Sequence, residues 1–295
     1  MTPQAFDAWM QHELDRVEQA LQAWVPPDAP AGLGEAMRYG VLDGGKRLRP
    51  LLVMAACEAV RGHAQAALRA AVAVELIHAY SLVHDDMPCM DNDVLRRGKP
   101  TVHVRYGEAQ AMLAGDAMQA LAFEVLTPDE QVPPALQARL CALLARAAGH
   151  AGMAGGQAID LASVGLQLSE EQLRDMHRRK TGALLRASVM MGAACGEPGE
   201  PARQALADYG AAIGLAFQVI DDVLDCTQAS DKLGKTAGKD QDSNKPTYVT
   251  VMGVERARAY ACGLRDDALR ALSGSGLAEV SALAILADRV VERDN

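Results

Sequence analysis

The sequence of 295 residues lacks the features of several broad protein classes. Alternating β-branched segments, which are typical of half-buried strands, are absent, so a sheet-based fold is not expected. There is no basic stripe, and the net charge of −9 with a pI of about 5.3 argues against nucleic acid as a partner. No uncharged apolar run reaches the roughly 18 residues that a membrane-spanning helix needs. We therefore expect no stable membrane insertion.

Paired cysteines and targeting signals are also missing. The six cysteines, at positions 57, 89, 141, 195, 226 and 262, form no C-x-x-C pair and show no zinc-like spacing with histidine. This pattern predicts buried thiols in a reducing compartment. The first residues, MTPQAFDAWMQHELDRVE, are acidic and amphipathic and lack the basic start and apolar core of a signal peptide. We expect a cytoplasmic protein.

Helical periodicity, by contrast, extends along nearly the whole sequence. Apolar residues recur at the spacing of one helix face, and alanine and leucine dominate these segments. The predicted helices cover an N-terminal stretch from Phe6 to Leu21 and the ranges 51–60, 66–86, 108–126, 134–148, 170–192, 202–228, 248–272 and 276–291. Glycine and proline concentrate in the short breaks, none of which is long enough for a linker. The sequence predicts an all-α fold with a single domain, residues 1–295.

The first group of candidate functional residues ends the predicted helix 66–86. It reads H-D-D-M-P-C-M-D, and Pro88 disfavours helical geometry at the preceding residue, so Asp91 can turn back toward Asp85 and Asp86. Carboxylate oxygens without histidine or cysteine partners suit Mg²⁺, which binds one or two carboxylates and keeps its other positions for water and phosphate. Taken alone, such a cluster would usually be a solvated helix end, but this one does not stand alone.

A second acidic cluster lies far downstream in F-Q-V-I-D-D-V-L-D. Asp225 follows Asp221 by four residues and Asp222 by three, so the three carboxylates share one side of a helix and repel each other unless a cation lies between them. Two clusters that face each other across a cleft would hold metal ions and a diphosphate between them. The two clusters together favour a metal-dependent diphosphate site.

Residues 44–50 read G-G-K-R-L-R-P and place three cations close together. The two glycines let the backbone approach an anion, and Lys46, Arg47 and Arg49 would surround it. A solvated basic turn is the alternative, but three neighbouring cations repel each other in an otherwise acidic protein. His78 precedes Asp85 by seven residues, about two helical turns, and so lies on nearly the same helix face.

These motifs resemble those of the trans-isoprenyl diphosphate synthases, among which the chain is most similar to the bacterial farnesyl diphosphate synthases. The resemblance rests on D-D-x-x-x-x-D at 85–91, D-D-x-x-D at 221–225 and G-G-K-R-L-R-P at 44–50. It implies the isoprenoid synthase fold, with antiparallel helices around a central active-site cavity. It also implies head-to-tail condensation of isopentenyl diphosphate with an allylic diphosphate (dimethylallyl, then geranyl diphosphate) to give farnesyl diphosphate.

The resemblance further implies a role for each site residue. The Mg²⁺ ligands would be Asp85, Asp91 and Asp221, with Asp160 supporting the metal's water shell. The diphosphate of isopentenyl diphosphate would bind Lys46, Arg49, His78 and Arg97. The allylic diphosphate would bind Arg96, Lys180, Lys235 and Lys245, and its pocket would include Thr181 and Gln218. Gly182 suggests a kink or a close helix contact that exposes a carbonyl able to stabilise a carbocation.

Product length is expected to depend on the residues just before the first acidic cluster. Ser81 lies four residues before Asp85, almost directly beneath it on a helix, and Tyr80 lies on the flank. The small Ser81 leaves room that the Tyr80 ring closes, which by resemblance suits a fifteen-carbon product. Each further isoprene unit would otherwise contribute up to about 4 kcal/mol of apolar burial.

Several alternatives remain. A geranylgeranyl or other chain-length synthase would share these motifs, whereas a non-catalytic subunit of a heteromeric synthase would be expected to have lost one acidic cluster. A histidine–aspartate phosphohydrolase would need more histidine ligands than His84 beside Asp85, and a terpene cyclase would replace the second cluster. By resemblance alone, the chain forms a homodimer.

Overall fold

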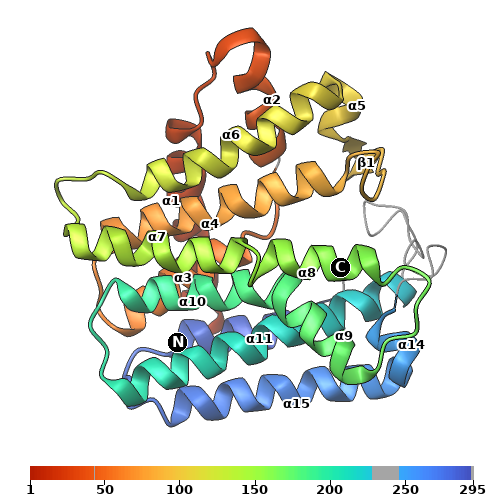
Figure 1. Ribbon diagram of the computed structural model, residues 1–295. Helices are drawn as coiled ribbons and strands as arrows, with labels where there is room; N and C mark the ends of the chain where they lie inside the picture. The colour runs from red at the N-terminus through yellow and green to blue at the C-terminus, as the bar shows by residue number, and fades with distance from the viewer. Residues whose placement is uncertain (43, 228–245, 294–295) are drawn as a thin grey trace.

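The computed structural model describes residues 1–42, 44–227 and 246–293, which form a bundle of helices (Figure 1). The helices are α1 (Pro3–Trp24), η1 (Pro30–Gly32), α2 (Leu33–Val41), α3 (Leu48–Ala59), α4 (Ala64–Asp85), α5 (Val102–Tyr106), α6 (Glu108–Leu126), α7 (Pro134–Ala148), α8 (Met153–Ala162), α9 (Glu170–His177), η2 (Arg178–Gly182), α10 (Ala183–Ala194), α11 (Glu200–Thr227), α14 (Tyr248–Met252), α15 (Val254–Ser273) and α16 (Ser281–Val291). A hairpin of two-residue strands, β1 (Leu95–Arg96) and β2 (Lys99–Pro100), interrupts them. The predicted all-α class is confirmed.

The long helices pack along one another, and Figure 1 shows α4, α6, α10, α11 and α15 running roughly along the same direction. Two large groups of buried side chains fill the space between them. One joins α4 to α3, α6, α7 and α10, and the other joins α3, α10 and α11 to α15 and α16. A smaller group lies between α9, α11, α14 and α15. Because α3 and α10 contribute to both large groups, the two halves of the bundle are continuous.

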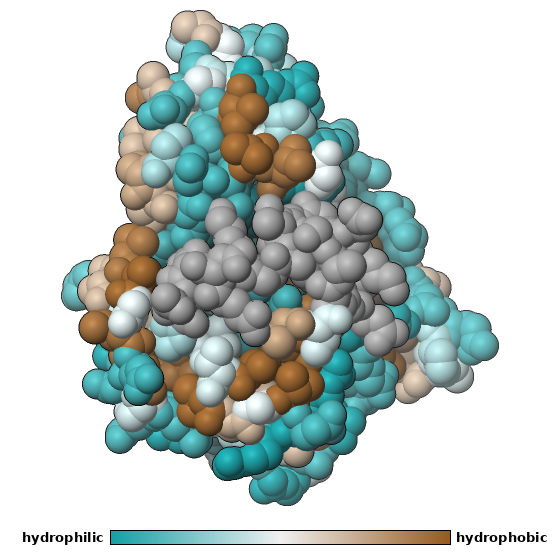
Figure 2. Space-filling view, turned by 90° about the vertical axis from the view of Figure 1, so that its right-hand side faces the viewer, coloured by the Kyte–Doolittle hydropathy of each residue, from teal (hydrophilic) through white to brown (hydrophobic). Residues whose placement is uncertain are grey.

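Helix α4 lies at the centre of the fold. Its alanine- and valine-rich sequence is buried on almost every side, and its first turn is capped by His63, whose Nδ1 accepts a hydrogen bond from the Ala66 amide. Among the described helices it alone is long and apolar enough to cross a membrane, but 78% of that window is buried by the fold, as in a core helix. On the side that carries β1 and α14, separate apolar patches interrupt a mainly hydrophilic surface (Figure 2).

Three sequence predictions need correction. The range 170–192 is not one α-helix, because residues 178–182 form a π-helix between α9 and α10. The range 248–272 is broken at Gly253, whose φ of 81° ends α14 and starts α15. Cys89 and Cys226 are exposed, so the prediction that all six thiols are buried was wrong. By contrast, α6 and α7 have the predicted bounds.

Candidate active site

A cavity of about 960 Å³ lies between α3, α4, α8, η2 and α11. Thirteen of the fifteen predicted site residues line it: Lys46, Arg49, His78, Tyr80, Ser81, Asp85, Asp91, Arg96, Arg97, Lys180, Thr181, Gln218 and Asp221. The remaining two, Lys235 and Lys245, lie outside the described residues. Residues that are up to 175 positions apart in the sequence therefore meet in one space.

The first acidic cluster folds as the sequence predicted. Helix α4 ends at Asp85, three residues before Pro88, and the chain turns back so that the Asp91 amide donates to the Asp85 carbonyl oxygen at 2.8 Å. Burial raises the pKa of Asp85 to about 6 against the opposing charge of Lys180, and Asp91 adds to the rise. The two carboxylates therefore form a site at which an added cation would be stabilised.

Asp86 points elsewhere and is only 2% exposed. It accepts two hydrogen bonds from Arg96 Nε, at 3.0 and 2.8 Å, and one from Nη2 at 2.6 Å. A charge-assisted pair of this geometry is strong because the planar guanidinium matches the carboxylate. Arg96 lines the cavity, but its main contact fastens the β1–β2 hairpin to the end of α4.

The hairpin brings Arg97 to the glycine-rich loop. Arg97 and Gly98 have φ values of 52° and 74°, which is the geometry of a tight two-residue hairpin turn. The Arg97 guanidinium donates to the Gly44 carbonyl oxygen, and a Cβ on Gly45 would lie 2.7 Å from its Nη2. Gly45 thus makes room for a cation, whereas the sequence had suggested that the glycines make room for an anion.

The basic side of the cavity also contains Arg49 and His78. Arg49 is 9% exposed, and its Nε has no hydrogen-bond partner among the described residues. Burial and then the charges of Arg49 and Arg97 hold the pKa of His78 well below its usual range, so this imidazole is neutral. Lys46 is exposed at the mouth. This group is suited to an anion with several oxygens.

The three carboxylates of the second acidic cluster differ in exposure. Only Asp221 stays accessible, and its Oδ1 lies 3.2 Å from Arg293 Nη2. Asp222 is 4% exposed and accepts hydrogen bonds from Gln218 Nε2 and from the Tyr248 amide, both at 2.8 Å, while Asp225 is 7% exposed. In this conformation Asp221 is therefore the carboxylate of this cluster that remains open to a cation, while Asp222 and Asp225 are buried.

The π-helix supplies the groups between the two clusters. Lys180 Nζ lies 2.6 Å from Asp160 Oδ2, and Thr181 Oγ1 donates to Gln218 Oε1 at 2.7 Å. A Cβ on Gly156 would lie 2.1 Å from the Lys180 amide, and one on Gly214 would lie 2.9 Å from Gly182 Cα. Helices α8 and α11 therefore touch the backbone of η2, which confirms the predicted irregularity and close contact at Gly182.

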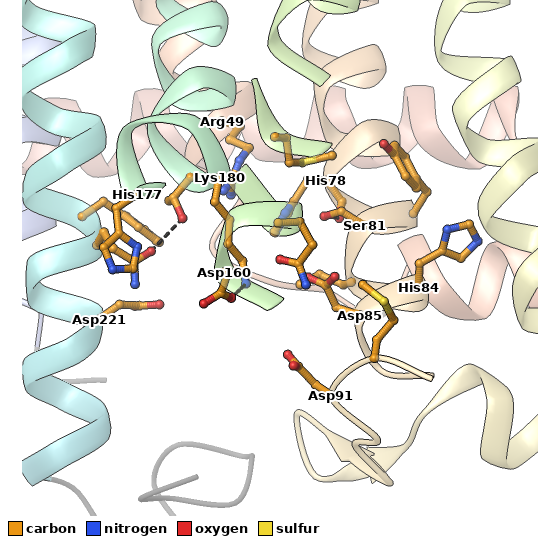
Figure 3. Close-up of a pocket in the computed structure, with 18 of the residues that line it drawn as sticks. Arg49, His78, Ser81, His84, Asp85, Asp91, Asp160, His177, Lys180 and Asp221 are labelled. Carbon is orange, nitrogen blue, oxygen red and sulfur yellow. Dashed lines mark hydrogen bonds and ion pairs between the residues drawn. The ribbon is translucent and has the colours of Figure 1, made fainter. Parts of the chain in front are cut away.

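Figure 3 shows the resulting arrangement. Asp85 and Asp91 lie on one side of the cavity and Asp221 on the other, with Lys180 and Asp160 between them. His84 points away from the carboxylates, and its Nε2 contacts the Met112 carbonyl oxygen at 3.0 Å. This orientation argues against a metal phosphohydrolase that uses His84 and Asp85 together.

The two proposed chain-length residues also reach the cavity. Tyr80 is 9% exposed, lies edge-on to the His84 ring at 5.7 Å, and receives a long hydrogen bond of 3.5 Å from Gln119 Nε2 of α6. Ser81 Oγ donates to the His78 carbonyl oxygen at 2.8 Å. The Tyr80 ring is thus both part of the cavity wall and part of the contact with α6.

Arg293 and His177 are among the cavity residues that were not predicted as site residues. Arg293 stacks on the Phe217 ring at 4.0 Å and donates to the Phe217 carbonyl oxygen at 3.0 Å. His177 packs against the Tyr248 ring at 5.5 Å, and neither ring nitrogen has a partner among the described residues. Burial lowers the pKa of His177 to about 4. In the sequence, His177 opens a basic run with Arg178 and Arg179, and Arg293 lies near the C-terminus.

The described residues contain no group of three or more histidine, cysteine or acidic side chains that could hold a metal alone. This arrangement fits Mg²⁺, which is usually bound through one or two protein carboxylates with water and substrate phosphate in its other positions. The donor set on both sides of the cavity consists of carboxylates. Metal and diphosphate would therefore bind together.

Known proteins are similar to this chain in fold and in sequence. The sequence matches the Polyprenyl synthetase family over residues 30–271. It is 45% identical over 301 residues to heterodimeric geranylgeranyl pyrophosphate synthase large subunit 1, chloroplastic, of Arabidopsis thaliana, covering 99% of this chain and 81% of that protein. An FPP/GFPP synthase from Zymomonas mobilis has a TM-score of 0.86 and 40% identity, over 97% of this chain and 99% of that one.

A further solved structure is the geranyltransferase from Helicobacter pylori complexed with magnesium and isoprenyl diphosphate. It has a TM-score of 0.84 and 34% identity, and the match covers 99% of this chain and 97% of that chain. The family match, the sequence identity and the shared fold agree with the motifs at residues 44–50, 85–91 and 221–225. This chain therefore belongs to the polyprenyl synthetase family, the trans-isoprenyl diphosphate synthases.

Proposed function

We propose that the protein condenses isopentenyl diphosphate with an allylic diphosphate in the 960 Å³ cavity. Head-to-tail prenyl transfer is the reaction of its family, and the chain is a prenyltransferase. The observation that carries the assignment of the site is the placement of Asp85 and Asp91 opposite Asp221, with Lys180 between them. A separate basic group, Arg49 with His78 and Arg97, provides room for a second diphosphate.

We propose Mg²⁺ as the metal, held by Asp85, Asp91 and Asp221. Bound there, it would neutralise the charge that develops on the leaving diphosphate. Burial and the charge of Asp91 raise the pKa of Asp85, so a cation placed between the two carboxylates would stabilise their ionised forms. Asp160 holds Lys180 by a 2.6 Å ion pair and so orients its ammonium group toward the same anion.

Different residues of the chain bind the two diphosphates. Lys180 and Arg96 favour departure of the allylic diphosphate, since positive charge stabilises a leaving group that becomes more anionic. Lys46, Arg49 and Arg97 hold isopentenyl diphosphate, and neutral His78 donates or accepts a hydrogen bond there. Thr181 of the π-helix donates to Gln218 at 2.7 Å, and a carbonyl oxygen exposed by this irregular turn would stabilise the allylic cation in our assignment.

The product length has two candidates. The relatives named as geranylgeranyl diphosphate synthases support a twenty-carbon product better than the farnesyl product expected from the sequence. The fifteen-carbon candidate is favoured by one observation, the Tyr80 ring in the cavity wall beneath Asp85. The Zymomonas mobilis protein carries both FPP and GFPP in its name, so one fold accommodates several lengths.

We propose that residues 1–295 act as one domain and assemble as a homodimer in the cytoplasm. An Arabidopsis relative is the large subunit of a heterodimeric synthase, which makes a heteromeric assembly the alternative. Both acidic clusters are intact in this chain, which supports a catalytic subunit in either assembly. Size-exclusion chromatography with light scattering on the purified chain distinguishes the homodimer from a monomer that needs a partner.

The test is incubation of the purified protein with Mg²⁺, isopentenyl diphosphate and, in separate reactions, dimethylallyl, geranyl or farnesyl diphosphate. We expect Mg²⁺-dependent release of diphosphate and a longer prenyl product, identified by mass after extraction. A product from farnesyl diphosphate would support the twenty-carbon candidate, and a product that stops at fifteen carbons would support the other. No product from any primer, with the protein folded, would overturn the proposal.

A further inference from the structure

Arg47 lies between the two proposed diphosphate ligands Lys46 and Arg49, yet it does not point to the open cavity. Arg47 is 4% exposed, and its guanidinium makes three polar contacts. Nε donates to Glu18 at 2.6 Å, Nη1 donates to Glu75 at 2.7 Å, and Nη2 donates to the Val41 carbonyl oxygen at 2.7 Å. One side chain therefore ties the start of α3 to α1, α2 and α4.

The backbone at Arg47 shows what these contacts hold in place. Its φ of 46° and ψ of 33° lie in the left-handed region, which costs a residue with a Cβ about 1 kcal/mol or more. The residue directly precedes α3, and Arg49 belongs to the first turn of that helix. Because the strained residue sits between them, its geometry sets the direction in which Lys46 and Arg49 leave the backbone.

Glu75 links Arg47 to the proposed diphosphate ligand Arg49. It is 3% exposed, lines the cavity, and lies one helical turn before His78 on α4. Its charge acts on Arg47 and on Arg49 alike, but only Arg47 has a hydrogen bond with it among the described contacts. A buried carboxylate that lost this partner would attract the next cation. The nearest candidate is Arg49, whose Nε has no partner among the described residues.

We propose that Arg47 is a positioning residue that neutralises Glu75 and thereby leaves Arg49 available to the diphosphate of isopentenyl diphosphate. This inference rests on the proposed function, because it assigns Arg49 to that substrate. Arg47 does not need to touch the substrate. It acts through Glu75 and through the direction of the loop.

The test compares Arg47→Met, Glu75→Gln and the double variant in steady-state kinetics with each substrate varied in turn. Arg47→Met should raise the KM for isopentenyl diphosphate at least tenfold, while the KM for the allylic substrate changes by less than about threefold. The double variant should recover a large part of this loss, because a neutral glutamine side chain at position 75 no longer captures Arg49. The coupling between the two substitutions is the decisive quantity.

Arg69→Met is the matched control. Arg69 is also a buried arginine, 7% exposed, and is ion-paired with Asp129 at 2.5 Å, but it lies outside the cavity. Its loss should lower the melting temperature without a selective change in the KM for isopentenyl diphosphate. If Arg47→Met behaves like Arg69→Met, or if the double variant is no better than Arg47→Met, the inference is wrong. An inactive wild-type protein would instead refute the proposed function.

Should Arg47→Met fail to fold, Arg47→Lys gives the same test. Lysine keeps the charge that neutralises Glu75 but cannot make the three directed contacts of the guanidinium. We expect Arg47→Lys to retain most of the affinity for isopentenyl diphosphate, and Arg47→Lys with Glu75→Gln to show no further recovery. Equal losses of affinity for both substrates in Arg47→Lys would overturn the inference.

Discussion

Replacing Tyr80 by alanine should lengthen the product by at least one five-carbon unit, whichever length the wild-type protein makes. The Tyr80 ring forms part of the cavity wall, and neighbouring Ser81 is too small to close the same space. Without the ring, the growing chain can extend along α4 toward α6, where Gln119 now contacts the tyrosine hydroxyl at 3.5 Å. Ser81→Phe should have the opposite effect and shorten the product.

The magnitude follows from apolar burial. Five additional carbons contribute about 4 kcal/mol at roughly 0.8 kcal/mol per buried carbon. Ordering the extra prenyl unit costs about 2 kcal/mol in lost rotational freedom. The difference of about 2 kcal/mol corresponds to a preference of roughly 30-fold for the longer chain. Loss of the ring should cost about 2 to 4 kcal/mol of folding stability, which a protein of ordinary stability tolerates.

The assay is product identification by mass, together with a melting curve for each variant. Tyr80→Phe is the control, because it keeps the ring and removes only the weak hydroxyl contact with Gln119. It should leave product length unchanged. If Tyr80→Ala loses stability but releases the same product as wild type, the ring is ordinary core and another residue limits chain length.

Three further outcomes are expected. Asp85→Ala or Asp221→Ala should lower turnover by several orders of magnitude, and near-normal turnover in either variant would contradict the two-cluster site. Calorimetry without metal should show a constant or raised melting temperature for Asp85→Ala, whose buried carboxylate is repelled by Asp91, but not for Asp221→Ala, which removes the ion-pair partner of Arg293. Arg49→Ala should mainly raise the KM for isopentenyl diphosphate, and an equal effect on the allylic KM would refute the assignment. Burial lowers the pKa of His177 to about 4, so between about pH 6.5 and 4 the unfolded chain binds more protons than the folded chain. The free energy of unfolding therefore falls as the pH falls through this window. Urea unfolding of the wild-type protein should show that its free energy of unfolding falls by up to about 3 kcal/mol over this pH range, and His177→Phe should not show this fall. Identical pH profiles for the two proteins would refute the prediction.

The elements that the sequence predicted well are those with local signals. Helices α6 and α7 have their predicted bounds because Gly107, with φ of 88°, and Pro133 with Pro134 mark their starts. The turn at Asp91 follows from Pro88 and the end of α4. In each case the residues that decide the structure lie within a few positions of the feature they produce.

The π-helix at 178–182 was predicted only in part, as a kink or a close helix contact at Gly182. Its five residues, RRKTG, contain no proline and would continue an α-helix by their local preferences. The irregular turn forms where Gly156 of α8 and Gly214 of α11 allow two backbones to approach it closely. Those glycines are 26 and 32 residues from Gly182, so the cause lies in tertiary packing.

The ion pair between Arg293 and Asp221 also arises from tertiary packing, and it affects how Asp221 can bind a metal. Spacing within α11 indicated that three carboxylates would repel each other, and a metal was the expected remedy. In the structure Asp222 accepts hydrogen bonds from Gln218 and the Tyr248 amide, and Arg293 supplies the cation beside Asp221 from 72 residues away. An ion pair with one half-exposed partner is weak enough to exchange for a divalent ion. The arginine can therefore hold Asp221 in position without preventing the carboxylate from acting as a metal ligand.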